Sequence, residues 1–267
     1  MKNRLYQSKK WLEKKYCEEK LSVVEIAEEC GSSRQPIYRW IHLFNLTREY
    51  VIPTRPRSRY SLNERYFKNI DTGNKAYWLG FIAADGCVVN EKRHRVLCIE
   101  LSEKDKCHLK AFKKEIKFEG PIYEMKARGR SKPSCKIQVC SSKMVLDLVE
   151  SGVVPNKTHI LEPPDIDPKL YHHWIRGMFD GDGSISLCKD GYLRGEFFGT
   201  REVIEFIVKN IPGTDTISKK KKYKGYYHSF GGLGIATKIY NYLYKNSEIC
   251  LKRKKDKFLL KVKDSIV

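Results

Sequence analysis

Two aspartates and two lysines occupy matched positions in the two halves of this 267-residue sequence. Asp85 precedes Lys157 by 72 positions (157 − 85), and Asp182 precedes Lys254 by the same interval (254 − 182). Carboxylate oxygens are hard donors that suit Mg²⁺, and a lysine ammonium can polarise water or stabilise transition-state charge. The equal intervals indicate an internal duplication that gives each half one candidate metal ligand and one candidate catalytic lysine.

Each aspartate stands near the end of a mostly apolar segment that predicts a helix. The first segment, Trp78–Gly86, reads WLGFIAADG, and the second, Ile175–Gly183, reads IRGMFDGDG. Residues four positions apart share one helix face, and a mid-helix glycine costs about 0.5–1 kcal/mol relative to alanine. Small residues at that spacing therefore predict two helices whose backbones approach closely. The residues expected at this interface are Ala76, Gly80, Gly177 and Gly181, with Ala84 on the same stripe.

Parallel packing of these helices would bring Asp85 and Asp182 together at the C-terminal helix ends. The helix dipole disfavours a negative charge there by about 0.3–1 kcal/mol, and neighbouring carboxylates repel each other. A cation between or beside them would relieve both penalties, so the pair predicts a metal site. A single Asp-Gly pair would be an ordinary turn signal, and the glycine after each aspartate is expected to take the left-handed cap conformation.

The two segments resemble the nine-residue motif of the LAGLIDADG homing endonucleases, in the single-chain form that carries two motifs. The resemblance covers roughly residues 70 to 264. The matching positions are Gly80, Ile82, Ala84, Asp85 and Gly86 in the first copy and Gly177, Asp180, Asp182 and Gly183 in the second. The departures are Ala83, where the first aspartate of the motif is missing, and Arg176 and Gly181, where the motif has alanine. The second aspartate, which binds the catalytic metal in the family, is present in both copies.

This resemblance implies an α+β fold in which two pseudo-symmetric αββαββα halves, residues 70–165 and 166–267, form a DNA-binding saddle. It implies a monomeric, site-specific endonuclease that hydrolyses phosphodiester bonds of double-stranded DNA. The product would be a staggered double-strand break with 3′ overhangs. Because the two halves have diverged strongly, the target is expected to be long and asymmetric.

The resemblance also assigns roles to individual residues. Asp85 and Asp182 would hold the divalent cation, Mg²⁺ in catalysis, with Mn²⁺ or Ca²⁺ as substitutes in binding, and the backbone carbonyls of Ala84 and Gly181 are further candidate ligands. The candidate catalytic residues are Asp85, Asp182, Lys157, Lys252 and Lys254. Lys254 matches Lys157 by spacing, whereas Lys252 fits the family pattern slightly better, so the choice between these two lysines stays open.

The same fold also serves proteins that do not cut DNA. Non-cleaving DNA-binding regulators use it, and so do RNA intron maturases, for which RNA would be the partner. The presence of both aspartates favours the endonuclease, although some maturases keep them. Whether the gene lies within an intron or is a free-standing mobile element is open.

The composition points independently to a polyanionic partner. The chain has 52 basic and 32 acidic residues, a net charge of +20, and basic residues recur in every region. Nucleic acid is favoured over a membrane because no long apolar or amphipathic anchor is present, although ribosomal and very soluble proteins share such a charge. Without a signal peptide or an apolar span, we expect a cytoplasmic protein, associated with a prokaryotic or phage nucleoid or located in an organelle.

Residues 11 to 47 predict a helix-turn-helix unit within an N-terminal domain of residues 1–49. Ser22 and Glu25 form a capping box that opens its second helix, and the local sequence resembles helix-turn-helix domains often fused to DNA enzymes. In the third helix an apolar face recurs at helical spacing: Ile37, Trp40, Ile41 and Phe44. The opposite face can reach base edges or phosphates in a major groove, and it consists of Arg34, Gln35, Tyr38 and Arg39. A small trihelical protein-binding module is the alternative.

Residues 50–69 predict a basic linker rich in proline and arginine. The prolines disfavour helix and sheet. The arginines at alternate positions, Arg55, Arg57 and Arg59, suit an extended arm along a phosphate backbone or in a minor groove. A solvated spacer is an equal alternative, and a domain boundary lies here in either case.

Two hairpins of the predicted sheets carry basic runs on the side that faces solvent. In the first half they are Lys126, Arg128, Arg130 and Lys132, and in the second half Lys219, Lys220, Lys221, Lys222 and Lys224. A charge run by itself is usually a solvated surface. Two runs at equivalent hairpins of a duplicated domain favour a surface that straddles a duplex, and the resemblance implies that these strands read the major groove on either side of the cut.

Overall fold

The computed structural model of the chain divides into two compact units, Met1–Arg55 and Pro56–Val267. The structure describes residues 5–44, 46, 60–91, 94–127, 129, 132–188, 191–213, 216–220 and 225–263, without the side chains of residues 42 and 220. A search of the helices in these ranges finds none that could span a membrane.

The N-terminal unit consists of short helices around a small apolar core. Its elements are a 3₁₀ turn (Leu5–Gln7), α1 (Lys9–Glu13), a π-helical turn (Lys14–Glu18), α2 (Val23–Glu29) and α3 (Arg34–Leu43). The predicted capping box is confirmed, because Ser22 N donates to Glu25 Oε2 (2.7 Å) and Glu25 N donates to Ser22 Oγ (3.2 Å). The predicted apolar face of α3 is confirmed too, since Ile37 and Ile41 are buried. The two aromatic residues of that face pack against the same core.

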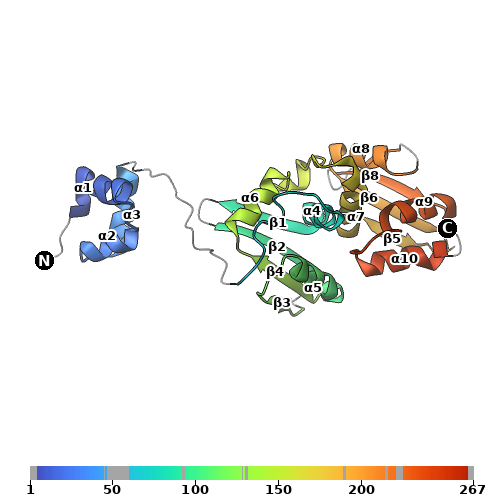
Figure 1. The fold of residues 1–267 in the computed structure, drawn as a ribbon, viewed down its shortest axis with the longest axis horizontal. Coiled ribbons are helices and arrows are strands. Elements are labelled where there is room, and N and C mark those ends of the chain that lie inside the picture. Colours follow the sequence, from blue (N-terminus) through green and yellow to red (C-terminus); the bar gives the residue numbers. More distant parts are fainter. Residues whose placement is uncertain are drawn as a thin grey trace. The chain divides into compact units, whose positions relative to one another are not determined.

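The larger unit confirms the predicted α+β fold of two αββαββα halves (Figure 1). The first half contains α4 (Gly73–Asp85), β1 (Gly86–Glu91), β2 (His94–Ser102), α5 (Lys106–Glu115), β3 (Ile122–Met125), β4 (Ser134–Val139) and α6 (Ser142–Glu150). The second half contains α7 (Tyr171–Gly181), β5 (Ser184–Leu187), β6 (Leu193–Gly199), α8 (Arg201–Asn210), β7 (Ser218–Lys220), β8 (Gly225–Gly231) and α9 (Leu233–Tyr244). Each half has one antiparallel sheet, in the order β1-β2-β4-β3 or β5-β6-β8-β7. The second half ends in a further helix, α10 (Lys252–Val262), which packs on α9 and β5.

Helices α4 and α7 lie side by side at the centre of the larger unit (Figure 1). A Cβ atom added at Gly80 would lie 2.2 Å from the backbone oxygen of Trp174, and one added at Gly181 would lie 2.3 Å from the Cβ of Ala84. The contacting pairs, Gly80 with Trp174 and Ala84 with Gly181, rise in residue number along both helices, so the helices run parallel. Gly80, Gly177 and Gly181 of the predicted interface therefore lie where the two helix backbones approach each other, and Ala76 is fully buried.

The expectation of left-handed caps after the two aspartates is wrong. Gly86 has φ −79° and ψ 148° and begins strand β1 directly, and Gly183 is not among the glycines with positive φ. A Cβ added at Gly86 would lie 2.5 Å from Ile82 Cγ2, and one added at Gly183 would lie 2.5 Å from Phe179 Cδ2. These glycines are needed because the chain passes closely over the last helical turn, where a Cβ has no room.

The predicted linker of residues 50–69 is too long at its C-terminal end. Tyr66 and Phe67 are buried in the core of the larger unit, and Tyr60, Leu62 and Ile70 pack against that core. Burial of these apolar side chains ties residues 60–70 to the first half, although the composition of the segment resembles that of a linker. Residues 50–59, which include all three predicted arm arginines, lie outside the described residues.

Candidate active site and nucleic-acid interface

Asp85 and Asp182 occupy equivalent places at the C-terminal ends of the paired helices. Asp85 is the last residue of α4, and Asp182 is the C-cap of α7. Both residues are exposed, yet the protein around each carboxylate removes enough water to raise its pKa, to about 6 for Asp182. Repulsion by Asp85 adds to the raised pKa of Asp182. The two carboxylates therefore interact with each other, and an added cation would stabilise their ionised form.

Lys157 and Lys254 occupy equivalent places at these helix ends, and both are buried, with 9% and 3% of their surface exposed. Lys157 Nζ donates to the backbone oxygen of Gly86, and Lys254 Nζ donates to the backbone oxygen of Gly183 at 2.5 Å. Burial lowers the pKa of both ammonium groups, to about 8 for Lys254, whereas the two aspartates act in the opposite direction. The matched spacing in the sequence thus corresponds to a matched contact in the structure.

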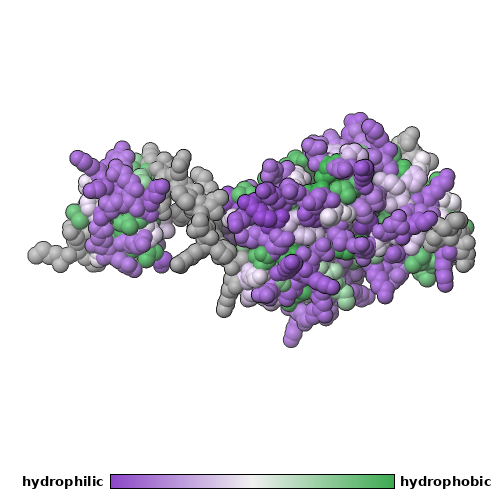
Figure 2. Space-filling model, in the orientation of Figure 1, coloured by the Kyte–Doolittle hydropathy of each residue, from purple (hydrophilic) through white to green (hydrophobic). Residues whose placement is uncertain are grey.

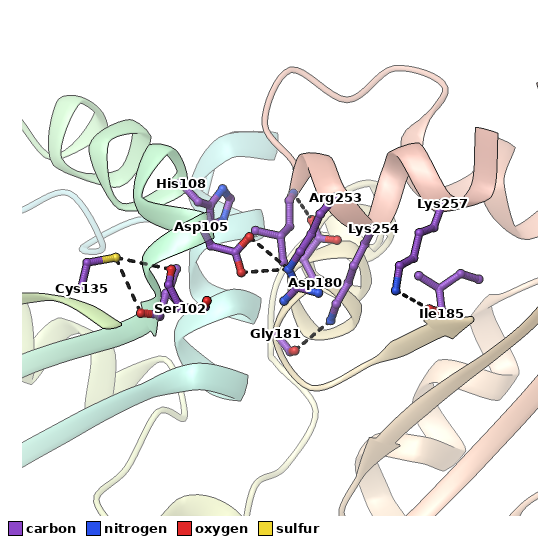
Figure 3. Close-up of polar contacts among 12 residues, drawn as sticks. Ser102, Asp105, His108, Cys135, Asp180, Gly181, Ile185, Arg253, Lys254 and Lys257 are labelled. Carbon is purple, nitrogen blue, oxygen red and sulfur yellow. Dashed lines mark hydrogen bonds and ion pairs between the residues drawn. The ribbon is translucent and has the colours of Figure 1, made fainter. Parts of the chain in front are cut away.

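The structure also separates the two lysines between which the sequence left the choice open. Lys254 Nζ donates to the backbone oxygens of Phe179 (2.7 Å) and Gly181 (2.9 Å) as well. Figure 3 shows this side chain extending from α10 toward the end of α7. Lys252, the first residue of α10, is exposed, and of the two lysines only Lys254 contacts the helix ends in the described part of the chain. The geometry therefore favours Lys254.

A buried aspartate holds helix α10 in place at this site. Asp180 is fully buried and accepts hydrogen bonds from Tyr77 Oη (2.9 Å), Tyr244 Oη (2.6 Å) and the backbone N of Leu251 (2.7 Å). Leu251 is the N-cap of α10, so the third bond fixes the end of the helix that carries Lys254. The sequence identified Asp180 as a motif residue, and only the fold reveals these three donors.

The first half holds its lysine differently. Ala83 stands at the position that matches Asp180 (180 − 83 and 182 − 85 are both 97) and has no side-chain acceptor. Lys157 begins a single 3₁₀ turn, Lys157–His159, after Asn156 in the left-handed conformation (φ 56°). The missing first aspartate of the motif therefore coincides with a short turn in place of a long helix.

An ion pair between the halves lies beside the site and was missed by sequence reasoning. Arg253 Nε donates to Asp105 Oδ1 (3.0 Å) and Oδ2 (2.8 Å), and the Asp105 side chain is only 7% exposed. Figure 3 shows Arg253 reaching from α10 to Asp105 of the first half. The Arg253 charge lowers the pKa of Asp85, and the Asp105 charge raises it. A separation of 148 positions leaves no local pattern that could reveal this pair.

The carboxylate pair fits a divalent cation, because it offers oxygen donors whose ionised form is disfavoured by burial and repulsion. Among the predicted carbonyl ligands, that of Gly181 accepts a hydrogen bond from Lys254 (2.9 Å). The carbonyl of Ala84 belongs to the last turn of α4, where carbonyl groups have no partner within the helix. Within the described ranges, no group of three or more His, Cys, Asp or Glu side chains could hold a metal. A divalent cation held by the two aspartates would therefore need water or substrate oxygens to complete its coordination shell.

The predicted nucleic-acid-binding residues that the structure describes are exposed. Lys126 and Lys132 lie beyond the ends of β3 and β4, and Lys219 lies in β7 with its Nζ 5.8 Å from the centre of the Tyr226 ring. In the N-terminal unit, α3 exposes Arg34, Gln35, Tyr38 and Arg39. The surface in view is largely hydrophilic over the larger unit (Figure 2). The predicted residues outside the described residues are Arg55, Arg57, Arg59, Arg128, Arg130, Lys221, Lys222, Lys224 and the side chain of Lys220.

Two family domains match parts of the chain. Residues 73–151 match the family described as "LAGLIDADG-like domain", and residues 16–66 match the family described as "Winged helix-turn helix". The search of curated proteins gave no match.

Solved structures with a similar fold include three protein–DNA complexes. One is meganuclease I-SmaMI bound to uncleaveable DNA, at 14% identity over 69% of this chain and 88% of that one, with a TM-score of 0.49. Another is the I-LtrWI LAGLIDADG homing endonuclease bound to target DNA, at 17% identity over 77% of this chain and 94% of that one, with a TM-score of 0.47. A third is I-SmaMI bound to an uncleaved DNA target in the presence of calcium ions, at 13% identity over 72% and 93% of the chains, with a TM-score of 0.47.

Proposed function

We propose that this chain, whose residues 73–151 match the LAGLIDADG-like domain family and whose residues 16–66 match a winged helix-turn-helix family, is a sequence-specific endonuclease for double-stranded DNA. The observation that carries the proposal is the duplicated centre at the ends of two parallel helices. Asp85 and Asp182 interact there, and Lys157 and Lys254 are buried at the glycine after each aspartate. A net charge of +20 supplies the general attraction to phosphates.

The chemistry follows from the charges at this centre. Hydrolysis of a phosphodiester needs an activated water, neutralisation of the scissile phosphate and stabilisation of the leaving oxygen, and a divalent cation, Mg²⁺ in this proposal, supplies all three when bound. Asp85 and Asp182 would hold that cation together with substrate and water oxygens. Lys157 and Lys254 add positive charge where negative charge develops on the phosphate. Their hydrogen bonds to backbone carbonyls fix both ammonium groups before DNA binds.

The product and target follow from the duplication. One aspartate per half supports one cut in each strand, and the staggered break with 3′ overhangs is proposed from the family resemblance. A monomer suffices because both centres lie in one chain. The outer faces of the two sheets differ, since Cys98 faces Cys87 in the first sheet where Glu196 faces Ser184 in the second. The target is therefore long and asymmetric, and the N-terminal unit extends it at one end.

A non-cleaving DNA-binding regulator or an RNA intron maturase is the second candidate. It would use the same basic surfaces without needing metal chemistry. The observation that favours it is the pair of buried lysines, whose charges offset part of the burial and the Asp85 repulsion that raise the pKa of Asp182, and so lessen the need for a cation. Cleavage, rather than binding, distinguishes the two candidates.

Incubation of the full chain with a randomised duplex library, in Mg²⁺ and in EDTA, followed by sequencing of the ends, tests the proposal. The expected result is discrete, metal-dependent breaks with 3′ overhangs at one asymmetric site. Asp85→Asn and Asp182→Asn should each abolish double-strand cleavage, because the amide removes the charge that holds the cation. Each should keep DNA affinity within about tenfold, or about 1.4 kcal/mol. Binding without cleavage would favour the second candidate, and normal cutting by either variant would overturn the assignment of the aspartates.

A further inference from the structure

Two cysteines face each other across the first two strands of the first sheet. Cys87 of β1 and Cys98 of β2 are direct partners in the antiparallel register, and both are free thiols. The next residues along the strands, Val88 and Ile99, are buried, so the two cysteine side chains lie on the outer face of the sheet. In the strand registers that the structure describes, no other two cysteines are partners. This face therefore carries one cross-strand dithiol.

The spacing of the two thiols is close to that of a disulfide. Cβ atoms of directly opposite residues lie about 4.5–5.5 Å apart, and a disulfide needs about 3.5–4.5 Å, so closure requires a shift of about 1 Å. Burial raises the pKa of the Cys98 thiol, Lys136 of β4 opposes this through its charge and a hydrogen bond, and Cys87 raises that pKa further. The two thiols thus interact already, and the bond that they can form is strained, which makes a disulfide easy to reduce.

The dithiol adjoins the candidate active site. Cys87 is two positions after Asp85 and directly follows Gly86, whose backbone oxygen accepts a hydrogen bond from Lys157 Nζ. The Cys87 thiol also raises the pKa of Lys157, in the same direction as the two aspartates. Strand β1 is an edge strand of its sheet, so a bond to Cys98 can draw it inward. Closure of the disulfide therefore displaces the backbone that holds Lys157.

We propose that Cys87 and Cys98 are a reversible oxidation site, closed by a low-molecular-weight disulfide such as oxidised glutathione, and that the closed form does not cleave DNA. The sulfur of Cys87, the more exposed of the two, attacks one sulfur of the oxidant, and the S–S bond breaks. The first small thiol leaves with the proton of Cys87. The sulfur of Cys98 then attacks the Cys87 sulfur of this mixed disulfide, and the second small thiol leaves with the proton of Cys98. The two cysteines lose two electrons and two protons, which the oxidant gains as two thiols.

The oxidation site belongs to the first half alone. At the equivalent place in the second sheet Ser184 faces Glu196, and neither side chain can form a disulfide. The expected loss of cleavage rests on the proposed function, whereas the cross-link rests on the strand register and forms in a chain of any function.

Incubation of the full chain with excess oxidised glutathione tests the site. After the remaining thiols are alkylated, mass spectrometry of the unreduced digest should find the peptides of Cys87 and Cys98 joined, and dithiothreitol should separate them. Cleavage of the target that the reduced chain selects should fall about 100-fold on oxidation, as for a displacement of about 1 Å at a reacting centre. Reduction should restore it.

Two serine variants test the order of the steps. Cys98→Ser lacks the second sulfur and should stop at the mixed disulfide, with glutathione bound to Cys87. Cys87→Ser should form no cross-link, and its rate of cleavage should be the same before and after oxidation.

Cys107→Ser is the matched control. Cys107 is also exposed but lies on α5, away from the strand pair. This variant should form the cross-link and lose cleavage on oxidation as the wild type does.

The outcomes separate the oxidation site from the proposed function. A wild-type chain that stays uncross-linked, or that keeps glutathione on Cys87, would overturn the dithiol. A cross-linked chain that cuts normally, or a Cys87→Ser chain inactivated as strongly as the wild type, would overturn the control of the active site. A reduced chain that cuts no DNA would overturn the endonuclease, and the mapped cross-link would still decide whether the dithiol closes.

Discussion

Replacement of Gly80 by alanine tests the close packing of α4 and α7, because this glycine faces backbone rather than a side chain. The added Cβ would lie 2.2 Å from the backbone oxygen of Trp174 and 3.0 Å from its carbonyl carbon. Ordinary van der Waals contact begins at 3.4 Å. The helices would therefore have to separate locally by roughly 1.2 Å (3.4 − 2.2), since no side-chain rotation can relieve the contact.

The expected loss of stability follows from that displacement. Overpacking of a core costs typically about 1–3 kcal/mol when side chains can adjust. In Gly80→Ala the new Cβ meets the backbone of the neighbouring helix, which cannot adjust by side-chain rotation, so we expect a cost of about 3 kcal/mol or above. The better helix propensity of alanine offsets only about 0.5–1 kcal/mol. The same separation displaces Asp85 from Asp182, and a misplacement of about 1 Å at a reacting centre can cost about 100-fold in rate. We therefore expect a lower free energy of unfolding together with a large loss of cleavage.

Urea unfolding followed by tryptophan fluorescence measures the first quantity, because Trp78 and Trp174 are buried on the paired helices. Gly234→Ala is the matched control. Gly234 also lies in a helix, α9, but an added Cβ there meets nothing within 4 Å, so this variant should gain about 0.5–1 kcal/mol. The packing argument would be refuted if Gly80→Ala stayed within about 1 kcal/mol of the wild type and cut normally, or if both alanine variants shifted stability alike.

The remaining predictions concern the lysines, the metal-free site and the N-terminal unit. Lys254→Met should lower stability by about 1–3 kcal/mol, because three carbonyl oxygens lose a buried donor, and should abolish cleavage, whereas Lys252→Met should change neither. A cleavage assay with the reverse ranking would assign the role to Lys252. In EDTA, Asp182→Asn should raise the urea midpoint near pH 7 but not near pH 4. The pKa of the Asp182 carboxyl is about 6 in the folded chain and 3.8 ordinarily, so the folded chain binds this proton more tightly. The contribution of Asp182 to stability therefore falls as the pH rises from about 3.8 to about 6. Equal midpoints near pH 7 would contradict this reasoning. Deletion of residues 1–59 should shorten the DNase I footprint and spare cleavage, and an unchanged footprint would mean that the N-terminal unit does not contact DNA.

The paired helices and the residues at their ends could be predicted from the sequence because their signals are local and occur twice. The spacing of the small residues can be read within each helix segment alone. The interval of 72 residues from aspartate to lysine occurs in both copies, so each copy supports the other. The sequence nevertheless predicted the wrong reason for glycine at positions 86 and 183, namely a left-handed cap. A glycine after a helix can be required by a positive φ or by the lack of room for a Cβ, and the sequence is the same in both cases.

Contacts between distant segments could not be predicted, since they depend on register and on how the elements pack. Asp105 and Arg253 are 148 positions apart, and Glu196 and Ser229 are 33 apart on paired strands. The choice between Lys252 and Lys254 depends on the rotation of α10, which the bond from Leu251 to the buried Asp180 helps to fix. The α10 segment itself carries a partial signal, because Phe258 and Val262 follow Lys254 at four-residue intervals and are buried with it, whereas Lys252 is exposed.

Burial disfavours the charged form of both kinds of side chain at the helix ends, since it lowers the pKa of the lysines and raises the pKa of the aspartates, but the lysines have backbone partners that offset this cost. The lysines satisfy backbone carbonyls at the negative ends of α4 and α7, where a positive charge is favourable. The aspartates occupy the same ends, where a negative charge is unfavourable, and burial raises their pKa further. Structural demands alone therefore account for Lys157 and Lys254 but not for Asp85 and Asp182. A residue kept at a cost to stability in both copies of a duplicated fold needs a functional reason, and a bound cation on a DNA substrate supplies one.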